Sequence, residues 1–147
     1  MKNITIDSNI LMDFLFKRDG HEKAAEIFAH CAKKEINGFI CAHEITTLSY
    51  FLEKSVNDKA MIKKSISGIM KRFKVIEINE EILAIALHSA IDDFEDAVIE
   101  VSSKEKNVDY IITRNIKDFK RSLIKALTPE ELLALLHSKP ENTENKN

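Results

Sequence analysis

The sequence predicts an α/β fold in which helices cover both faces of a central parallel sheet. Short β-branched and aromatic runs alternate with longer stretches whose apolar residues recur at helical spacing. Only three Gly and two Pro interrupt the 147 residues, so connections between these elements should be short. Because strands that alternate with helices form right-handed βαβ units, we expect a parallel sheet with helices on each face.

Five short runs have the residue composition of strands. In chain order they are Asn3–Ile6, Gly38–Cys41, Lys74–Ile78, Asp109–Thr113 and Ile124–Leu127. The stretches between them are expected to be helices, and four of these carry apolar stripes that should face the core. The stripes begin at Ile10, Ile45, Ile62 and Ile82.

The end of the chain carries the clearest helix signal. Thr128 is a capping residue, and Pro129 follows it at the first helical position. With Glu131 as the third helical residue, the pattern predicts a last helix that runs to about His137. We expect a single domain over residues 1–137, followed by a disordered polar tail over residues 138–147.

Composition excludes several classes of protein. The formal net charge of −2 is not that of a protein that holds nucleic acid by bulk electrostatics. Cys31 and Cys41 have no metal-site or disulfide spacing, and the five histidines show no paired ligand spacing. The sequence has no apolar run of the roughly 20 residues that a membrane span needs and no signal-peptide core, so we expect a cytoplasmic protein without a membrane partner.

Acidic and amide residues directly after strands are the candidate functional residues, because open parallel sheets bind ligands beyond the carboxyl ends of their strands. Asp7 follows the first predicted strand, and Glu44 begins the helix after the second. Asn115 and Asp118 follow the fourth strand. Several carboxylates should therefore point at one spot.

A further acidic run, residues 92–96, enters the helix that ends near Lys106. At 100° per residue, Asp93, Asp96 and Glu100 share an arc of about 60°, and Phe94 lies on the core side. Helix capping by Asp93 and a first-turn acid would stabilise the helix by around 1 kcal/mol, which explains one or two of these acids.

Capping is also the alternative for the other acids. Asp7 can cap the following helix, although Ser8 or Asn9 can do so equally well, and Glu44 can be an ordinary first-turn acid. Crowded carboxylates raise one another's pKa values unless a cation neutralises them. Because the set offers oxygen ligands, the natural cation is Mg²⁺ or Mn²⁺, which activates water and stabilises charge on a phosphodiester.

These motifs resemble those of the PIN domain family, whose bacterial members include VapC-type toxin ribonucleases. The resemblance runs from about residue 3 to residue 136 and rests on four motifs in the family's order. They are Ile4-Thr5-Ile6-Asp7-Ser8-Asn9, Glu44, Asp93-Phe94-Glu95-Asp96-Ala97 and the segment from Tyr110 to Phe119. The resemblance implies a three-layer α/β/α sandwich and an endoribonuclease that depends on Mg²⁺ or Mn²⁺.

The resemblance also implies residue roles. Asp7, Glu44 and Asp96 match the family's metal-binding acids. Many members carry Asp where this chain has Asn115, so Asp118 is taken as the fourth catalytic and metal-binding carboxylate, with Asp93 as an additional ligand candidate. The residues assigned to position the substrate or the attacking water are Asn9, Thr113, Arg114 and Asn115.

The implied partners are an RNA substrate, a small antitoxin protein and a second copy of the chain as a homodimer. Lys117, Lys120 and Arg121 surround the fourth motif and can offer a basic rim to an RNA backbone.

Two other functions stay open. A phosphatase would use Asp7 as a covalent nucleophile, although the usual D-x-D signature is absent. A catalytically degenerate PIN-like module would only bind RNA or protein. The retained acids Asp7, Glu44 and Asp96 argue against this function, whereas Asn115 in place of Asp argues for it.

Overall fold

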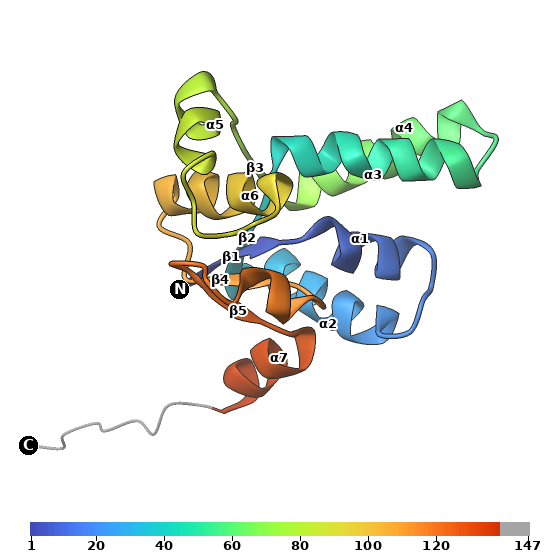
Figure 1. Cartoon of the computed structure of the whole chain (residues 1–147). Coiled ribbons are helices and arrows are strands. Elements are labelled where there is room, and N and C mark those ends of the chain that lie inside the picture. The colour runs from blue at the N-terminus through green and yellow to red at the C-terminus, as the bar shows by residue number, and fades with distance from the viewer. Residues whose placement is uncertain (139–147) are drawn as a thin grey trace, which may run out of the picture.

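A five-stranded parallel sheet forms the centre of the protein (Figure 1). The computed structural model describes residues 1–138, and its strands follow the order β3-β2-β1-β4-β5. Each strand coincides with a predicted run, so the predicted parallel sheet is confirmed. The strands are β1 (Lys2–Ile6), β2 (Ile36–Cys41), β3 (Lys74–Ile76), β4 (Tyr110–Ile112) and β5 (Lys125–Leu127).

Helices occupy most of the chain between and after the strands. They are α1 (Ser8–Leu15), α2 (His21–Ala32), α3 (Ala42–Ser55), α4 (Lys59–Arg72), α5 (Glu80–Ala86), α6 (Phe94–Glu105), the 3₁₀ helix η1 (Ile116–Phe119) and α7 (Pro129–His137). The last helix is the one predicted from its capping residues, and Thr128 Oγ1 accepts a hydrogen bond from the Glu131 backbone N–H at 3.2 Å. No helix of the described residues is both long enough and apolar enough to span a membrane.

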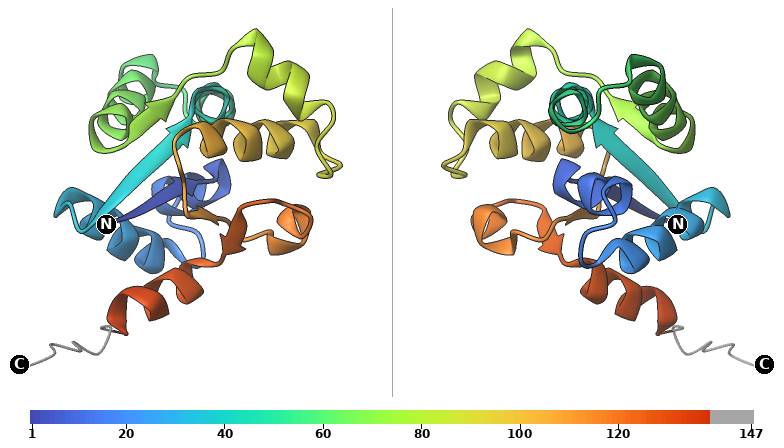
Figure 2. Two further views of the ribbon diagram at one scale, coloured as in Figure 1. Left: turned by 90° about the vertical axis from the view of Figure 1, so that its left-hand side faces the viewer. Right: turned by 90° about the vertical axis from the view of Figure 1, so that its right-hand side faces the viewer.

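The sheet separates two hydrophobic clusters because successive side chains of a strand point to opposite faces. Ile40 packs in one cluster with residues of α1, α2, α3, α4 and α7, whereas Phe39 and Cys41 pack in the other with residues of α5, α6 and η1. Figure 2 shows α2 and α7 on one side of the sheet and α5 and α6 on the other. The predicted three-layer α/β/α sandwich is therefore confirmed.

The order of the strands determines where the candidate residues meet. β1 lies in the middle and pairs with both β2 and β4, with Thr5 opposite Phe39 and Ile6 opposite Ile112. The carboxyl ends of all three strands therefore lie along one edge of the sheet. The residues that follow them open α1, α3 and the loop after β4.

Two expectations for α6 are wrong. Phe94 is 46% exposed, because it is the first residue of the helix and lies outside the cluster that covers the sheet. Glu100 is buried away from the other acids, where its carboxylate accepts hydrogen bonds from Ser89 Oγ at 2.8 Å and from the Leu123 backbone N–H at 2.7 Å. Of the predicted tail, residues 139–147 lie outside the described residues.

Candidate functional site

Asp7 lies at the carboxyl end of the central strand, directly before α1, and is buried. Its Oδ2 atom accepts hydrogen bonds from Thr113 Oγ1 at 2.8 Å and from Asn9 Nδ2 at 3.2 Å. Asp7 is the N-cap residue of α1, but its side chain makes no capping hydrogen bond to that helix. Burial raises the pKa of Asp7, although the bond from Thr113 opposes the shift.

Glu44 lies in the first turn of α3 and is only 1% exposed. Its Oε2 atom accepts a hydrogen bond from the Ser8 backbone N–H at 2.9 Å, so the carboxylate points to the junction of β1 and α1. Burial, followed by the charge of Asp7, raises the pKa of Glu44 to about 9. Glu44 is therefore not a solvated first-turn acid.

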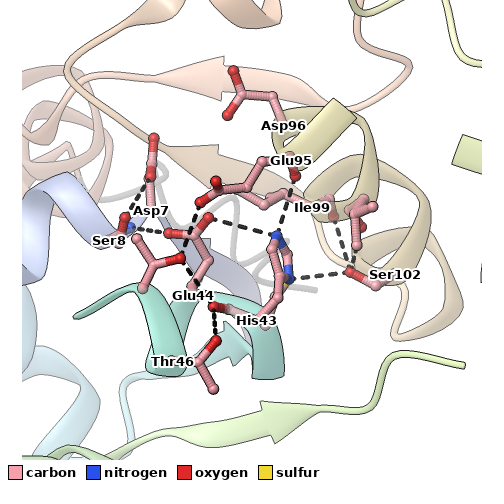
Figure 3. A network of polar contacts seen from close by, with 12 residues as sticks. Asp7, Ser8, His43, Glu44, Thr46, Glu95, Asp96, Ile99 and Ser102 are labelled. Carbon is pink, nitrogen blue, oxygen red and sulfur yellow. Dashed lines mark hydrogen bonds and ion pairs between the residues drawn. The ribbon is translucent and has the colours of Figure 1, made fainter. Parts of the chain in front are cut away.

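Asp96 reaches the same place from α6. Figure 3 shows the side chains of Asp7, Glu44, Glu95 and Asp96 gathered from β1, α3 and α6. Burial raises the pKa of Asp96 to about 7, and the charge of Asp7 is the next largest cause. Of the three acids predicted as the principal site residues, Asp7 therefore lies close enough to both Glu44 and Asp96 for its charge to act on each.

Asp93 and Asp118 lie at the margin of this group and are exposed. Asp93 caps α6, since its Oδ1 atom accepts a hydrogen bond from the Asp96 backbone N–H at 3.0 Å. Asp118 lies in η1, and its charge contributes to the raised pKa of Asp96, as does that of Asp93. Asp93 therefore has a structural role, and Asp118 acts on the group through its charge.

Glu95 and His43 belong to the site but are not among the predicted site residues. One ligand atom each of His43, Glu44 and Glu95 lies within 4.8 Å of the other two. His43 Nε2 donates a hydrogen bond to the Glu95 backbone oxygen at 3.1 Å and lies 3.6 Å from Glu44 Oε1 (Figure 3). Burial lowers the pKa of His43. The acidic run and the position of His43 beside Glu44 were the only sequence signals for these two residues.

The donor set fits a hard divalent cation. The pKa values of Asp7, Glu44 and Asp96 are all raised, because burial without a counter-charge is unfavourable for ionised carboxylates. In addition, the buried Oδ1 atom of Asn9 has no hydrogen-bond partner among the described residues. Carboxylate and amide oxygens, together with bound water, are the ligands that Mg²⁺ and Mn²⁺ prefer.

The loop after β4 supplies the remaining predicted residues. Thr113 is fully buried, and its Oγ1 atom also accepts a hydrogen bond from the Asn115 backbone N–H at 3.0 Å. Asn115 itself is exposed. Arg114 points to α1, where its Nε atom lies 2.8 Å from Oδ2 of the buried Asp13. Burial raises the pKa of Asp13, and Arg114 opposes the shift, so the sequence prediction missed a buried acid that holds a predicted site residue.

The basic residues after this loop lie next to the acidic group. A cavity of about 240 Å³ is lined by Asp93 and Asp118 together with Lys117, Lys120 and Arg121. All three basic residues are exposed. Positive side chains thus adjoin the carboxylates in a protein whose net charge is −2.

The comparisons with known proteins agree with this arrangement. The family model described as PIN domain matches residues 3–117. No curated protein matches the sequence.

Three solved structures share the fold at low sequence identity. VapBC2 from Rickettsia felis, bound to a DNA fragment from its promoter, is 18% identical with a TM-score of 0.66, over 86% of this chain and 98% of that chain. A toxin–antitoxin complex from Klebsiella pneumoniae is 23% identical with a TM-score of 0.62, over 86% and 97%. VapC20 from Mycobacterium tuberculosis, a toxin that cleaves the sarcin-ricin loop, is 13% identical with a TM-score of 0.59, over 74% and 86%.

Proposed function

Since this chain belongs to the PIN domain family, we propose that it is a divalent-metal-dependent endoribonuclease that hydrolyses RNA phosphodiester bonds. The observation that carries the proposal is the position of Asp7 beside both Glu44 and Asp96: burial raises the pKa of all three acids, and the charge of Asp7 adds to the shifts of Glu44 and Asp96. A carboxylate group of this kind is poised to bind a cation and to work on a phosphate ester. The structurally similar VapC20 is described as a toxin that cleaves an RNA loop.

The cofactor would be Mg²⁺ or Mn²⁺, held by Asp7, Glu44 and Asp96. When bound, it lowers the pKa of a coordinated water and stabilises the negative charge that develops on the phosphate. Asp118 contributes the fourth carboxylate from the exposed margin of the site, and Glu95 adds negative charge beside Glu44. Asp93 keeps α6 in place by capping it.

The uncharged residues position these groups. Thr113 and Asn9 donate hydrogen bonds to Asp7 Oδ2 and so fix the orientation of its carboxylate. The free Oδ1 atom of Asn9 can accept a hydrogen bond from the attacking water. Arg114, held by Asp13, and the exposed side chain of Asn115 face the approaching RNA, whose backbone is bound by the adjoining lysines and arginine.

The biological setting follows from the same relatives. We propose a single nuclease domain over residues 1–137 that acts in the cytoplasm as the toxin of a toxin–antitoxin pair, with a small antitoxin as its partner and a homodimer as its assembly. The similar structures from R. felis and K. pneumoniae contain such pairs. Both cysteines are buried, and burial raises the pKa of the Cys31 and Cys41 thiols to about 12, so they are unreactive in a reducing compartment.

The test is Mn²⁺-supported cleavage of a structured RNA by the wild type and by Asp96→Asn. We expect Asp96→Asn to lower the rate by at least about 100-fold, the upper end of what the loss of an outer-shell partner costs a metal site. Its metal-free stability should be unchanged or higher, because a repelling charge is removed. Glu105→Gln, which removes an exposed acid from the other end of α6, is the matched control and should cleave as the wild type does.

Other outcomes identify the alternatives. Equal cleavage by Asp96→Asn and wild type would place catalysis elsewhere. RNA binding without cleavage at any metal concentration would favour the degenerate module, and hydrolysis of a small phosphomonoester alone would favour the phosphatase.

A further inference from the structure

Two histidines and a glutamate meet on the outer surface of α2 and α7, away from the carboxylates described above. Glu26 and His30 are one turn apart on α2, and His137 is the last residue of α7. One ligand atom of each lies within 4.8 Å of the other two. The two helices pack side by side (Figure 2). As a result, His137 Nε2 lies 2.8 Å from Glu26 Oε1, although the two residues are 111 positions apart in the chain.

We propose that Glu26, His30 and His137 form a binding site for a borderline divalent cation, foremost Zn²⁺, that joins α7 to α2. Two imidazole nitrogens and one carboxylate oxygen suit Zn²⁺ and not Mg²⁺, which prefers oxygen ligands. Three protein ligands also leave a fourth tetrahedral position for water. The site differs in both place and chemistry from the carboxylate group.

A second observation orients one of the ligands. His30 Nδ1 is hydrogen-bonded to the Glu35 carboxylate. A carboxylate can only accept, so the Nδ1 atom carries the proton and the Nε2 atom keeps a lone pair for a metal. This is the carboxylate–histidine–metal arrangement that fixes the tautomer and the ring orientation of metal ligands. The His30 side chain is only 19% exposed, so its orientation is also fixed by packing.

The other two ligands are accessible and close to the required geometry. The side chains of Glu26 and His137 are 44% and 60% exposed, and the rings of His30 and His137 have centroids 6.3 Å apart. Neighbouring ligand atoms of a tetrahedral zinc site are about 3.3 Å apart, since Zn–N bonds are about 2.0–2.1 Å. A rotation of the exposed His137 ring brings its nitrogen atom closer to the ligand atoms of His30 and Glu26. The cation then takes the place of the proton in the hydrogen bond between His137 and Glu26.

The bound cation would hold the end of α7. The beginning of this helix is fixed by the Thr128 cap and by Leu132 and Leu133, which are buried against the sheet. The last turn contributes only the partly buried Leu136 to that cluster. Zn²⁺ at His137 would therefore raise the unfolding temperature by tying this turn to α2.

The experiment is calorimetric titration of Zn²⁺ into the full chain in the presence of excess Mg²⁺, which occupies the carboxylates. We expect His30→Gln and His137→Gln each to weaken Zn²⁺ binding at least tenfold, and Glu35→Gln to weaken it about tenfold as an outer-shell change. His88→Gln is the matched control, because His88 is exposed and lies after α5 on the opposite side of the sheet. It should bind Zn²⁺ as tightly as the wild type.

A second measurement follows the effect of Zn²⁺ on stability. Zn²⁺ should raise the unfolding temperature of the wild type and of His88→Gln but not that of His137→Gln. Unchanged Zn²⁺ affinity in His30→Gln and His137→Gln, or an equal loss in His88→Gln, would overturn the proposal. Mn²⁺-dependent RNA cleavage by His137→Gln should equal that of the wild type, which separates this site from the proposed nuclease.

Discussion

Glu44 and Glu100 are both buried glutamates at 1% and 3% exposure, but their surroundings differ. Glu100, in the middle of α6, has a neutral donor for each oxygen, Ser89 Oγ for one and the Leu123 N–H for the other. Glu44, at the carboxyl edge of the sheet, has the Ser8 N–H for one oxygen and the charges of Asp7 and Glu95 beside it. Burial alone therefore does not distinguish an acid of the proposed site from a structural one. What distinguishes Glu44 is the neighbouring negative charge of Asp7 and Glu95, which opposes its ionisation.

The largest expected effect separates these two glutamates directly. Glu44→Gln should lower RNA cleavage by at least about 100-fold and raise metal-free stability, because it removes a carboxyl group whose ionisation burial and the charge of Asp7 oppose. Glu100→Gln should leave cleavage intact and lower stability by about 1–3 kcal/mol, because a buried hydrogen-bond network loses an acceptor. Urea unfolding and Mn²⁺-dependent RNA cleavage measure both. If the two variants behaved alike, the distinction between the acids would be wrong.

The next effect is a pH dependence of stability to which Glu44 and Asp96 should contribute most. The pKa values of Glu44 and Asp96 in the folded protein, about 9 and about 7, lie above their ordinary values of 4.5 and 3.8. The folded state therefore holds protons that the unfolded state has released, and metal-free stability should fall as pH rises from about 5 to about 9.

Unfolding midpoints across that pH range, with and without Mn²⁺, measure this slope. Mn²⁺ should flatten it, since the cation stabilises the charged carboxylates, and Glu44→Gln should reduce it without metal. A metal-free midpoint that rises between pH 5 and pH 9 would contradict the raised pKa values of Glu44 and Asp96.

The smallest effect concerns the margin of the site. Asp118→Ala should weaken Mn²⁺ binding and lower cleavage most at limiting metal, so that added Mn²⁺ restores part of the rate. Asn115→Asp should tighten Mn²⁺ binding if its side chain reaches the group. Calorimetric titration of both variants checks this, and affinities identical to that of the wild type would remove the loop after β4 from the metal site.

Much of this architecture could be predicted because it depends on local sequence. The β-branched runs predicted all five strands, and the position of Asp7 and Glu44 after strands predicted where they would meet. The PIN domain resemblance was confirmed by the family match. Each of these inferences needs only short sequence motifs and their order along the chain.

The predictions failed where a segment distant in the sequence determines what surrounds a residue. Asp96 and Glu100 do lie on one helical face, but Glu100 is roughly 6 Å further along the axis, where the residues around Ser89 and Leu123 cover it. His30 and His137 are far apart in the chain, so no spacing rule could pair them. Only the turn-long separation of Glu26 and His30 was visible in the sequence.

The central place of β1 has a consequence for how the protein is made. The first strand to leave the ribosome pairs with β4, and Asp7 depends for its orientation on Thr113, which is 106 residues later in the chain. Contacts so distant in sequence form late, and domains emerge from the ribosome beginning at the N-terminus. An incomplete nascent chain therefore has its first acid but not the partner that orients it. The proposed nuclease would therefore stay inactive until nearly all of its domain has been synthesised.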